Sequence, residues 1–313
     1  MTTVFLNGRL LSPGEARVSA FDAAVQHGVG LFETMTARRL NGHTRVFLLE
    51  EHLDRMIGSA RELGLSDALR APALAEAITR TVEASELDHA RVRLTITGGD
   101  LNLLGRARTQ DGGGAAPVEP TVLIVAQPAT VYPEEMFEHG ASATIADLKV
   151  NPLDPLAGHK TINYWGRLRE LQLAAAKKAG EGLVLQVTNH VCGGCVSNVF
   201  LVTGEGSGGG ARRELVTPIA RGEEASGAIP SPVLPGVTRG WLLEWAGRRR
   251  LPVRKRLVTI EDVLKADEVF LTNSSWGVMP VVRVEKHEVG DGEVGEVARD
   301  ALEAWREAQE ATG

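Results

Sequence analysis

The sequence predicts an α+β protein built as two lobes. The 313 residues exceed one compact core of ordinary size. Strand-like and helix-like apolar patterns alternate along the chain. A stretch bounded by Pro128 and Pro133 separates the first set of patterns from the second. We therefore predict a small α+β domain over residues 1–128, a linker over 129–136 and a larger domain over 137–313.

Turn residues and apolar spacing define the elements of the first lobe. Asn7-Gly8 between two apolar runs predicts a hairpin, and Asn41-Gly42 predicts a second turn. Pro72 stands where proline suits a helix start. In chain order we expect strands over 4–6, 9–11, 32–38, 91–97 and 121–126, and helices over 48–63 and 73–84.

The second lobe continues the mixture of strands and helices. A Gly-Gly turn at 193–194 separates two expected strands, and the Gly-rich residues 204–210 predict a loop. We expect strands over 141–147, 183–187, 196–203, 268–272 and 281–284, and helices over 161–179, 239–249 and 261–264.

Composition excludes several classes of function. The formal net charge is -6 and only 4% of residues are aromatic, which argues against a nucleic-acid platform. No apolar window is long enough to span a bilayer and the amino terminus does not look like a signal peptide, so we expect no membrane partner. Two cysteines cannot form a disulfide framework. We predict a cytoplasmic protein.

Lysines are few, and Lys160 stands out among them. It follows a loop containing proline and glycine and precedes a predicted helix, so its amine could reach into a cleft. The other interpretation is a solvated surface lysine. A lysine that forms a Schiff base needs a lowered amine pKa and a nearby anion-binding site for the phosphate of its cofactor.

Three segments supply candidate phosphate donors. The amides of Val237 and Thr238 lie at an expected helix start, where the helix dipole favours an anion. Hydroxyl groups follow an expected strand in Thr272-Asn-Ser-Ser275, and Arg55 could add a charge-assisted contact. Each feature alone is also what a helix cap or a surface ion pair would show.

Taken together, these segments resemble the class IV aminotransferases, which include branched-chain aminotransferase, D-amino acid aminotransferase and aminodeoxychorismate lyase. Their order and spacing match nearly from end to end. The segments that carry the resemblance are Phe21-Asp22, Gly28-x-Gly30-Leu-Phe-Glu-Thr34, Leu49-Glu-x-His52-x-x-Arg55, His159-Lys160-Thr-x-Asn163-Tyr164, Ser197-Asn198-Val-Phe200, Thr217-Pro218, Leu234-Pro-Gly-Val-Thr-Arg239, Ala266-Asp-Glu268, Thr272-Asn-Ser and Pro280-Val281.

The resemblance implies a fold-type IV enzyme that uses pyridoxal 5′-phosphate (PLP), with a small α+β lobe and a larger pseudo-barrel lobe. It implies a homodimer acting on a small-molecule amino acid and a keto acid. Lys160 would be the Schiff-base lysine and general base, and Tyr164 would bind the phenolic oxygen of the cofactor. The implied phosphate ligands are Arg55, Val237, Thr238 and Ser274, with Ser275 as a further candidate.

One position departs from the family pattern. Relatives typically carry a glutamate that pairs with the pyridine nitrogen of PLP, and this chain has Gly193 there. No Asp or Glu occurs from residue 182 to residue 204. Without that carboxylate the ring accepts electrons less readily. An acid from elsewhere in the fold could substitute; otherwise we expect slow transamination, a chemistry that needs less electron withdrawal, or binding without turnover.

Other motifs have structural interpretations. Cys192-Gly-Gly-Cys195, with His190 nearby, formally matches a redox or zinc pair, but its hairpin-like setting favours apolar packing and no metal. Gly204-x-Gly206-x-x-Gly209 opens no helix and is expected to be a loop insertion. Arg106 or Arg108 could hold a substrate carboxylate or be a surface arginine.

Three hypotheses follow. The first is a PLP-dependent aminotransferase acting on a small amino acid. The second is a lyase similar to aminodeoxychorismate lyase, which releases pyruvate and needs no keto acid acceptor. The third is a PLP-binding protein with weak or no transamination because of Gly193.

Overall fold

The computed structural model describes residues 1–100, 119–204 and 213–311. Within it the chain forms two compact units. The first comprises Met1–Thr130 together with Lys160–Asn163, and the second comprises Val131–His159 together with Tyr164–Gly313. The short segment with Lys160 therefore packs with the first unit, although the 29 residues before it, Val131–His159, belong to the second unit.

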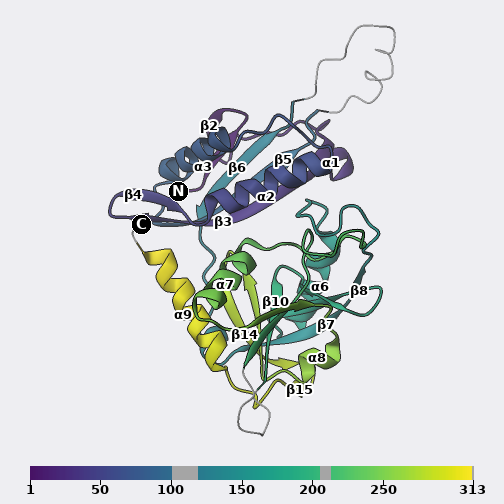
Figure 1. The fold of residues 1–313 in the computed structure, drawn as a ribbon. Coiled ribbons are helices and arrows are strands. Elements are labelled where there is room, and N and C mark those ends of the chain that lie inside the picture. The colour runs from purple at the N-terminus through teal and green to yellow at the C-terminus, as the bar shows by residue number, and fades with distance from the viewer. Residues whose placement is uncertain (101–118, 205–212, 312–313) are drawn as a thin grey trace. The chain divides into compact units, whose positions relative to one another are not determined.

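The first unit is a six-stranded sheet in the order β2-β1-β6-β5-β3-β4, in which every neighbouring pair is antiparallel. Both predicted turns are confirmed, since Asn7-Gly8 and Asn41-Gly42 all have positive φ. Helices α2 and α3 lie side by side against the sheet (Figure 1) and bury Met56 and Ile78 in a common core. The elements are β1 (Thr3–Leu6), β2 (Arg9–Leu11), α1 (Ala23–His27), β3 (Gly30–Leu40), β4 (His43–Val46), α2 (Leu49–Glu62), α3 (Ala71–Ser85), β5 (His89–Thr97) and β6 (Val122–Pro128).

The second unit is a nine-stranded mixed sheet in the order β12-β11-β10-β13-β14-β7-β8-β9, with β15 paired to β14. The sheet curls until its two ends meet: Val191 N, on β9, donates to Val258 O at 2.7 Å, just beyond β12. A bridge between His190 and Thr259 joins the same two segments. The elements are α5 (Glu135–Glu138), β7 (Ala141–Val150), α6 (Trp165–Ala176), β8 (Glu181–Gln186), β9 (Val191–Gly194), β10 (Asn198–Thr203), β11 (Glu214–Pro218), α7 (Val237–Arg248), β12 (Val253–Arg256), α8 (Ile260–Leu264), β13 (Glu268–Asn273), β14 (Gly277–Val284), β15 (His287–Glu288) and α9 (Glu296–Glu310).

Helix α9 was not among the expected elements, although its sequence carries a helical signal. Val297, Ala301 and Trp305 recur every four residues and all three are buried. Glu268 accepts hydrogen bonds from the amides of Val297 and Ala298 at 3.1 and 2.9 Å, which satisfies two donors at the helix start. Gly277 lets the ring of Trp305 lie directly on β14, because a Cβ there would come within 2.2 Å of the indole.

Two boundaries predicted for the second unit were wrong. The expected helix over 161–179 begins only at Trp165, because residues 160–162 pair with β3 instead. The expected strand over 196–203 begins at Asn198, because residues 195–197 form the turn between β9 and β10. In both cases an inter-strand contact overrides the local apolar pattern.

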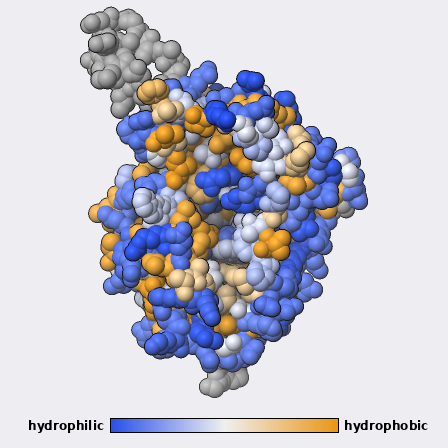
Figure 2. Space-filling model, turned by 180° about the vertical axis from the view of Figure 1, so that it is seen from behind, coloured by the Kyte–Doolittle hydropathy of each residue, from blue (hydrophilic) through white to orange (hydrophobic). Residues whose placement is uncertain are grey.

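The described residues include no helix with both the length and the apolar character needed to cross a bilayer. Orange apolar patches interrupt a largely hydrophilic surface in Figure 2.

Candidate functional site

Lys160 is fixed by strand β3 and not by a helix start as predicted. Its carbonyl accepts a hydrogen bond from Phe32 N at 2.9 Å, and Ile162 N donates to Gly30 O at 3.0 Å. Gly30 permits this close approach, since a Cβ there would lie 3.1 Å from the Ile162 side chain. The Lys160 amine sits over the Phe32 ring, 4.3 Å from its centroid, and Arg93 stacks on the same ring at 3.8 Å.

Arg55 belongs to a buried charged cluster in the same unit. Its Nε and Nη2 donate to the two carboxylate oxygens of Glu33, at 2.8 and 2.6 Å. His52 Nδ1 lies 2.7 Å from Glu33 Oε2. Arg55 and His52 come from successive turns of α2 and Glu33 from β3, so one sheet strand and one helix position all three side chains.

The electrostatics of this cluster follow from burial and pairing. Burial by itself would raise the pKa of Glu33, but the charge of Arg55 and the hydrogen bond from His52 outweigh it and lower the pKa to about 2. Burial also lowers the pKa of His52, which favours the neutral imidazole, and the positive charge of Lys160 acts in the same direction. The cluster therefore contains one bidentate ion pair, between the Glu33 carboxylate and the Arg55 guanidinium.

The predicted phosphate donors of the second unit come together at the start of α7. This helix begins at Val237 after Gly236, which has no side chain to cap the first amides. Thr238 is buried, and its Oγ1 lies 3.3 Å from the Oγ of Ser274, at the end of β13. Two hydroxyls and an uncapped helix start thus form a set of donors that suits an anion. Ser275 lies in the same turn and donates its amide to Asn273 Oδ1 at 2.9 Å.

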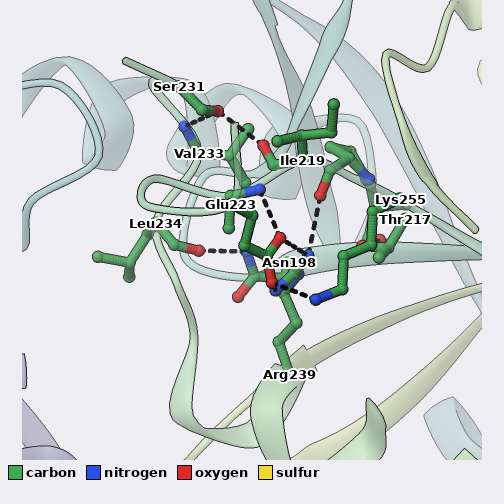
Figure 3. A network of polar contacts seen from close by, with 12 residues as sticks. Asn198, Thr217, Ile219, Glu223, Ser231, Val233, Leu234, Arg239 and Lys255 are labelled. Atoms are coloured by element: carbon green, nitrogen blue, oxygen red, sulfur yellow. Dashed lines mark hydrogen bonds and ion pairs between the residues drawn. The ribbon is translucent and has the colours of Figure 1, made fainter. Parts of the chain in front are cut away.

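A polar network holds this helix start in place (Figure 3). Arg239 donates to both carboxylate oxygens of Glu223, at 2.9 and 2.6 Å, and to Pro218 O at 3.1 Å. Asn198 donates to Leu234 O at 2.9 Å, just ahead of the helix. Three separate motifs that suggested the family, around residues 198, 217 and 234–239, therefore meet in one network that fixes the first turn of α7.

The glycine at position 193 has a backbone that excludes a side chain. Its φ is +146°, and a Cβ would lie 2.6 Å from the carbonyl oxygen of Ser197. A Cβ on the next residue, Gly194, would lie 2.7 Å from the carboxylate carbon of Glu181. The turn predicted at Gly193-Gly194 was wrong, because both glycines lie in β9 and residues 195–197 make the turn that follows. The end of β9 together with this turn, residues 193–197, forms a glycine turn that encloses the carboxylate of Glu181.

Tyr164 contacts the same turn. Its hydroxyl donates to Cys195 O at 3.3 Å, and the residue stands immediately before α6. The structure therefore places Tyr164 beside the turn that follows Gly193 and Gly194.

The two cysteines are free and buried, and they pack in different apolar clusters. Burial raises the pKa of each thiol to about 12, which disfavours the thiolate that redox chemistry or metal binding needs. Within the described residues, no group of three or more His, Cys, Asp or Glu side chains could hold a metal ion.

Comparison with known proteins identifies the relatives of this chain. Residues 30–284 match the family described as amino-transferase class IV. The chain belongs to this family. It is 26% identical to a putative branched-chain-amino-acid aminotransferase of Methanocaldococcus jannaschii, over 97% of this chain and 95% of that protein.

Two solved structures share the fold. The branched-chain amino acid aminotransferase of Escherichia coli superposes with a TM-score of 0.83, at 25% identity over 97% of this chain and 93% of that one. The 4-amino-4-deoxychorismate lyase of Pseudomonas aeruginosa superposes with a TM-score of 0.78, at 27% identity over 98% and 100% of the two chains. These matches confirm the predicted family, the fold-type IV architecture and the class of PLP-dependent aminotransferase.

Several residues of this class IV site were not singled out from the sequence. Glu33 and His52 lay inside the quoted motifs, but nothing in the sequence shows that Glu33 binds both Arg55 and His52. Glu181 and Arg167 are brought to the glycine turn by the pairing of β8 with β9 and by α6. Arg106 and Arg108 lie outside the described residues.

A side chain at position 193 is expected to be harmful. We predict that Gly193→Ala and Gly193→Glu each destabilise the protein by about 1–3 kcal/mol, the usual cost of a strained backbone, and that neither raises the rate. Thermal melts measure the loss of stability, and initial rates of amino-group exchange measure the activity. The matched control is Gly240→Ala in α7, where a Cβ meets nothing within 4 Å and a helical alanine should be neutral or stabilising. A faster Gly193→Glu enzyme would contradict the prediction.

Proposed function

We propose that this class IV enzyme is an aminotransferase acting on small amino acids, with PLP held on Lys160. The observation that carries the proposal is the position of Lys160, whose backbone is tied to β3 through its own carbonyl and through the amide of Ile162. A fixed backbone with a flexible four-carbon side chain suits an amine that must hold a cofactor and then move a proton.

The donors around the start of α7 support a phosphate site. We assign the phosphate to the amides of Val237 and Thr238 and to the hydroxyls of Thr238 and Ser274, with Ser275 in the same turn as a further ligand. Arg55 completes this set in the proposal, since its guanidinium is oriented by Glu33 and so loses little freedom on binding. Tyr164 is assigned to the phenolic oxygen of the cofactor.

PLP, when bound, withdraws electrons from the substrate Cα and carries the amino group from one substrate to the next. The protein's own part is proton transfer and positioning. We assign to Lys160 Nζ the removal of the Cα proton and its return during the exchange. The hydroxyl of Tyr164 lies beside Cys195 O, and we assign it to contact the phenolic oxygen at the edge of the cofactor ring.

The experiment that tests the function is an exchange assay. Purified PLP-loaded protein is incubated with single L- or D-amino acids and a keto acid acceptor, and new amino acids are measured by mass spectrometry. We expect a new amino acid that depends on both substrates. Absence of exchange for every pair, with the cofactor bound, would contradict the aminotransferase proposal.

A lyase is the second candidate, because the Pseudomonas aeruginosa lyase matches this chain over nearly its full length. A lyase would form pyruvate from aminodeoxychorismate without any keto acid acceptor. Coupling the reaction to lactate dehydrogenase distinguishes the two, since only pyruvate release oxidises NADH under those conditions.

We further propose a cytoplasmic homodimer. The two free cysteines suit a reducing compartment. Trp165 and Leu168, one turn apart on α6, expose 79% and 47% of their surface, and large apolar side chains this exposed often mark an interface. Light scattering should give twice the chain mass of 33.5 kDa, and a mass of 33.5 kDa would contradict the dimer.

A further inference from the structure

A guanidinium group contacts the turn in which Gly193 replaces the usual carboxylate. Arg167 lies on α6, and its Nη1 donates to Gly194 O at 3.1 Å and to Cys195 O at 3.3 Å. The Tyr164 hydroxyl donates to the same Cys195 oxygen at 3.3 Å. Two donors converge on one carbonyl oxygen, so the cation lies next to the Tyr164 hydroxyl.

The carboxylates near this turn are already engaged by the protein. Glu181 is fully buried, and its two oxygens accept from the amides of residues 182, 195 and 196 and from the hydroxyl of Ser197, at 2.9 to 3.3 Å. Glu170 is also buried and binds Asp147 N and Arg169. Both acids serve the protein's own donors, so neither supplies the missing partner of the ring nitrogen.

The positive charge of Arg167 acts on both cysteine thiols near the turn. Burial raises the pKa of both Cys192 and Cys195, and Arg167 opposes that rise at each thiol. Lys149 acts on Cys192 in the same direction, while Glu181 and Glu170 act on Cys195 in the opposite one. The charged groups facing the turn are therefore two cations and two enclosed carboxylates.

We propose that Arg167 is the charged group beside the ring nitrogen of PLP in this enzyme, and that it keeps this nitrogen unprotonated. The inference rests on the proposed function, which assigns Tyr164 to the phenolic oxygen. In the pyridine ring, only one carbon separates the carbon that bears this oxygen from the nitrogen. Arg167 shares an acceptor atom with Tyr164 and also binds the carbonyl of Gly194, next to Gly193, so we assign it to the nitrogen end of the ring.

A nearby cation disfavours protonation of the ring nitrogen, whereas a carboxylate favours it. The charge beside the nitrogen in this enzyme is then positive and not negative. An unprotonated ring withdraws electrons more weakly from Cα. We therefore expect Arg167 to slow the steps that depend on electron withdrawal, including the proposed amino-group exchange. Arg167 acts here as a positioning and electrostatic residue, since it moves no proton itself.

The test uses PLP labelled with ¹⁵N at the ring. The wild-type protein, Arg167→Met and Arg167→Lys are loaded with the labelled cofactor, and the ¹⁵N chemical shift of the ring is followed by NMR as pH is varied. We expect the neutral pyridine signal in the wild type at neutral pH. In Arg167→Met the titration should move up by roughly one to three pH units, and Arg167→Lys should restore wild-type behaviour.

Arg169→Met is the matched control, because Arg169 is an exposed arginine on the same helix that binds Glu170. Its titration should equal that of the wild type. Equal titrations for the wild type and Arg167→Met, or a pyridinium signal in the wild type at neutral pH, would overturn the role of Arg167. Borohydride reduction and peptide mapping of each sample separates the two claims: an adduct absent from Lys160 overturns the proposed function and this inference together.

Discussion

Replacing Lys160 with alanine is expected to lower kcat/KM for amino-group exchange by at least about 10²–10⁴-fold, the usual contribution of a positioned general base. The loss is larger still if the same amine also holds the cofactor. Steady-state rates in the exchange assay measure the effect.

The fold should survive this change, because only the side chain of Lys160 is removed. The backbone bond from Phe32 N to Lys160 O does not depend on that side chain. Melting temperatures should therefore stay close to wild type. Lys177→Ala is the control, since Lys177 is an exposed residue at the end of α6, and its rate should not change. A fully active Lys160→Ala enzyme would remove Lys160 from the mechanism.

Replacing Glu33 with alanine should destabilise the protein by about 3–5 kcal/mol, the usual result of removing one partner from a buried ion pair. Both oxygens of Glu33 bind the guanidinium of Arg55, whose side chain is only 11% exposed. The charge left behind has little access to water. Chemical denaturation gives the free energy of unfolding directly.

A surface ion pair provides the contrast. Glu76 and Arg80 on α3 pair at 3.7 Å with both side chains more than half exposed. Glu76→Ala should therefore cost less than about 1 kcal/mol. Equal losses of unfolding free energy for the Glu33 and Glu76 variants would show that the buried cluster stabilises the fold no more than a surface ion pair does.

The same cluster predicts how acid affects stability. The pKa of Glu33 falls from 4.5 to about 2 in the folded protein, so the native state holds this proton less tightly than the unfolded state. The stabilisation is fully present above pH 4.5 and is lost as pH falls toward 2. In the Glu33→Ala protein, the decline of stability over this window should be correspondingly shallower.

Much of the architecture was predictable because its signals are local. Asn7-Gly8 and Asn41-Gly42 need only their own φ preferences to form hairpin turns. The amphipathic patterns of α2 and α3 depend on spacing within a single helix. Thr238 and Ser274, the proposed phosphate ligands, were also named in advance, since one stands at an expected helix start and the other just after an expected strand.

What could not be predicted depends on contacts between distant segments. Nothing near Lys160 in the sequence shows that residues 160–162 pair with Gly30 and Phe32, so a helix was expected there. Glu181 lies just before the strand expected over 183–187, and only the pairing of β8 with β9 encloses its carboxylate. Arg167 likewise reads as one of several polar residues on a helix until the glycine turn is placed against it.

The most direct test of the central claim is borohydride reduction of the PLP-loaded protein followed by peptide mass mapping. We predict a single phosphopyridoxyl adduct, located on Lys160 and absent from the Lys160→Ala protein. A protein that binds PLP but carries the adduct on another lysine, or carries none, would contradict the assignment of Lys160 as the cofactor lysine.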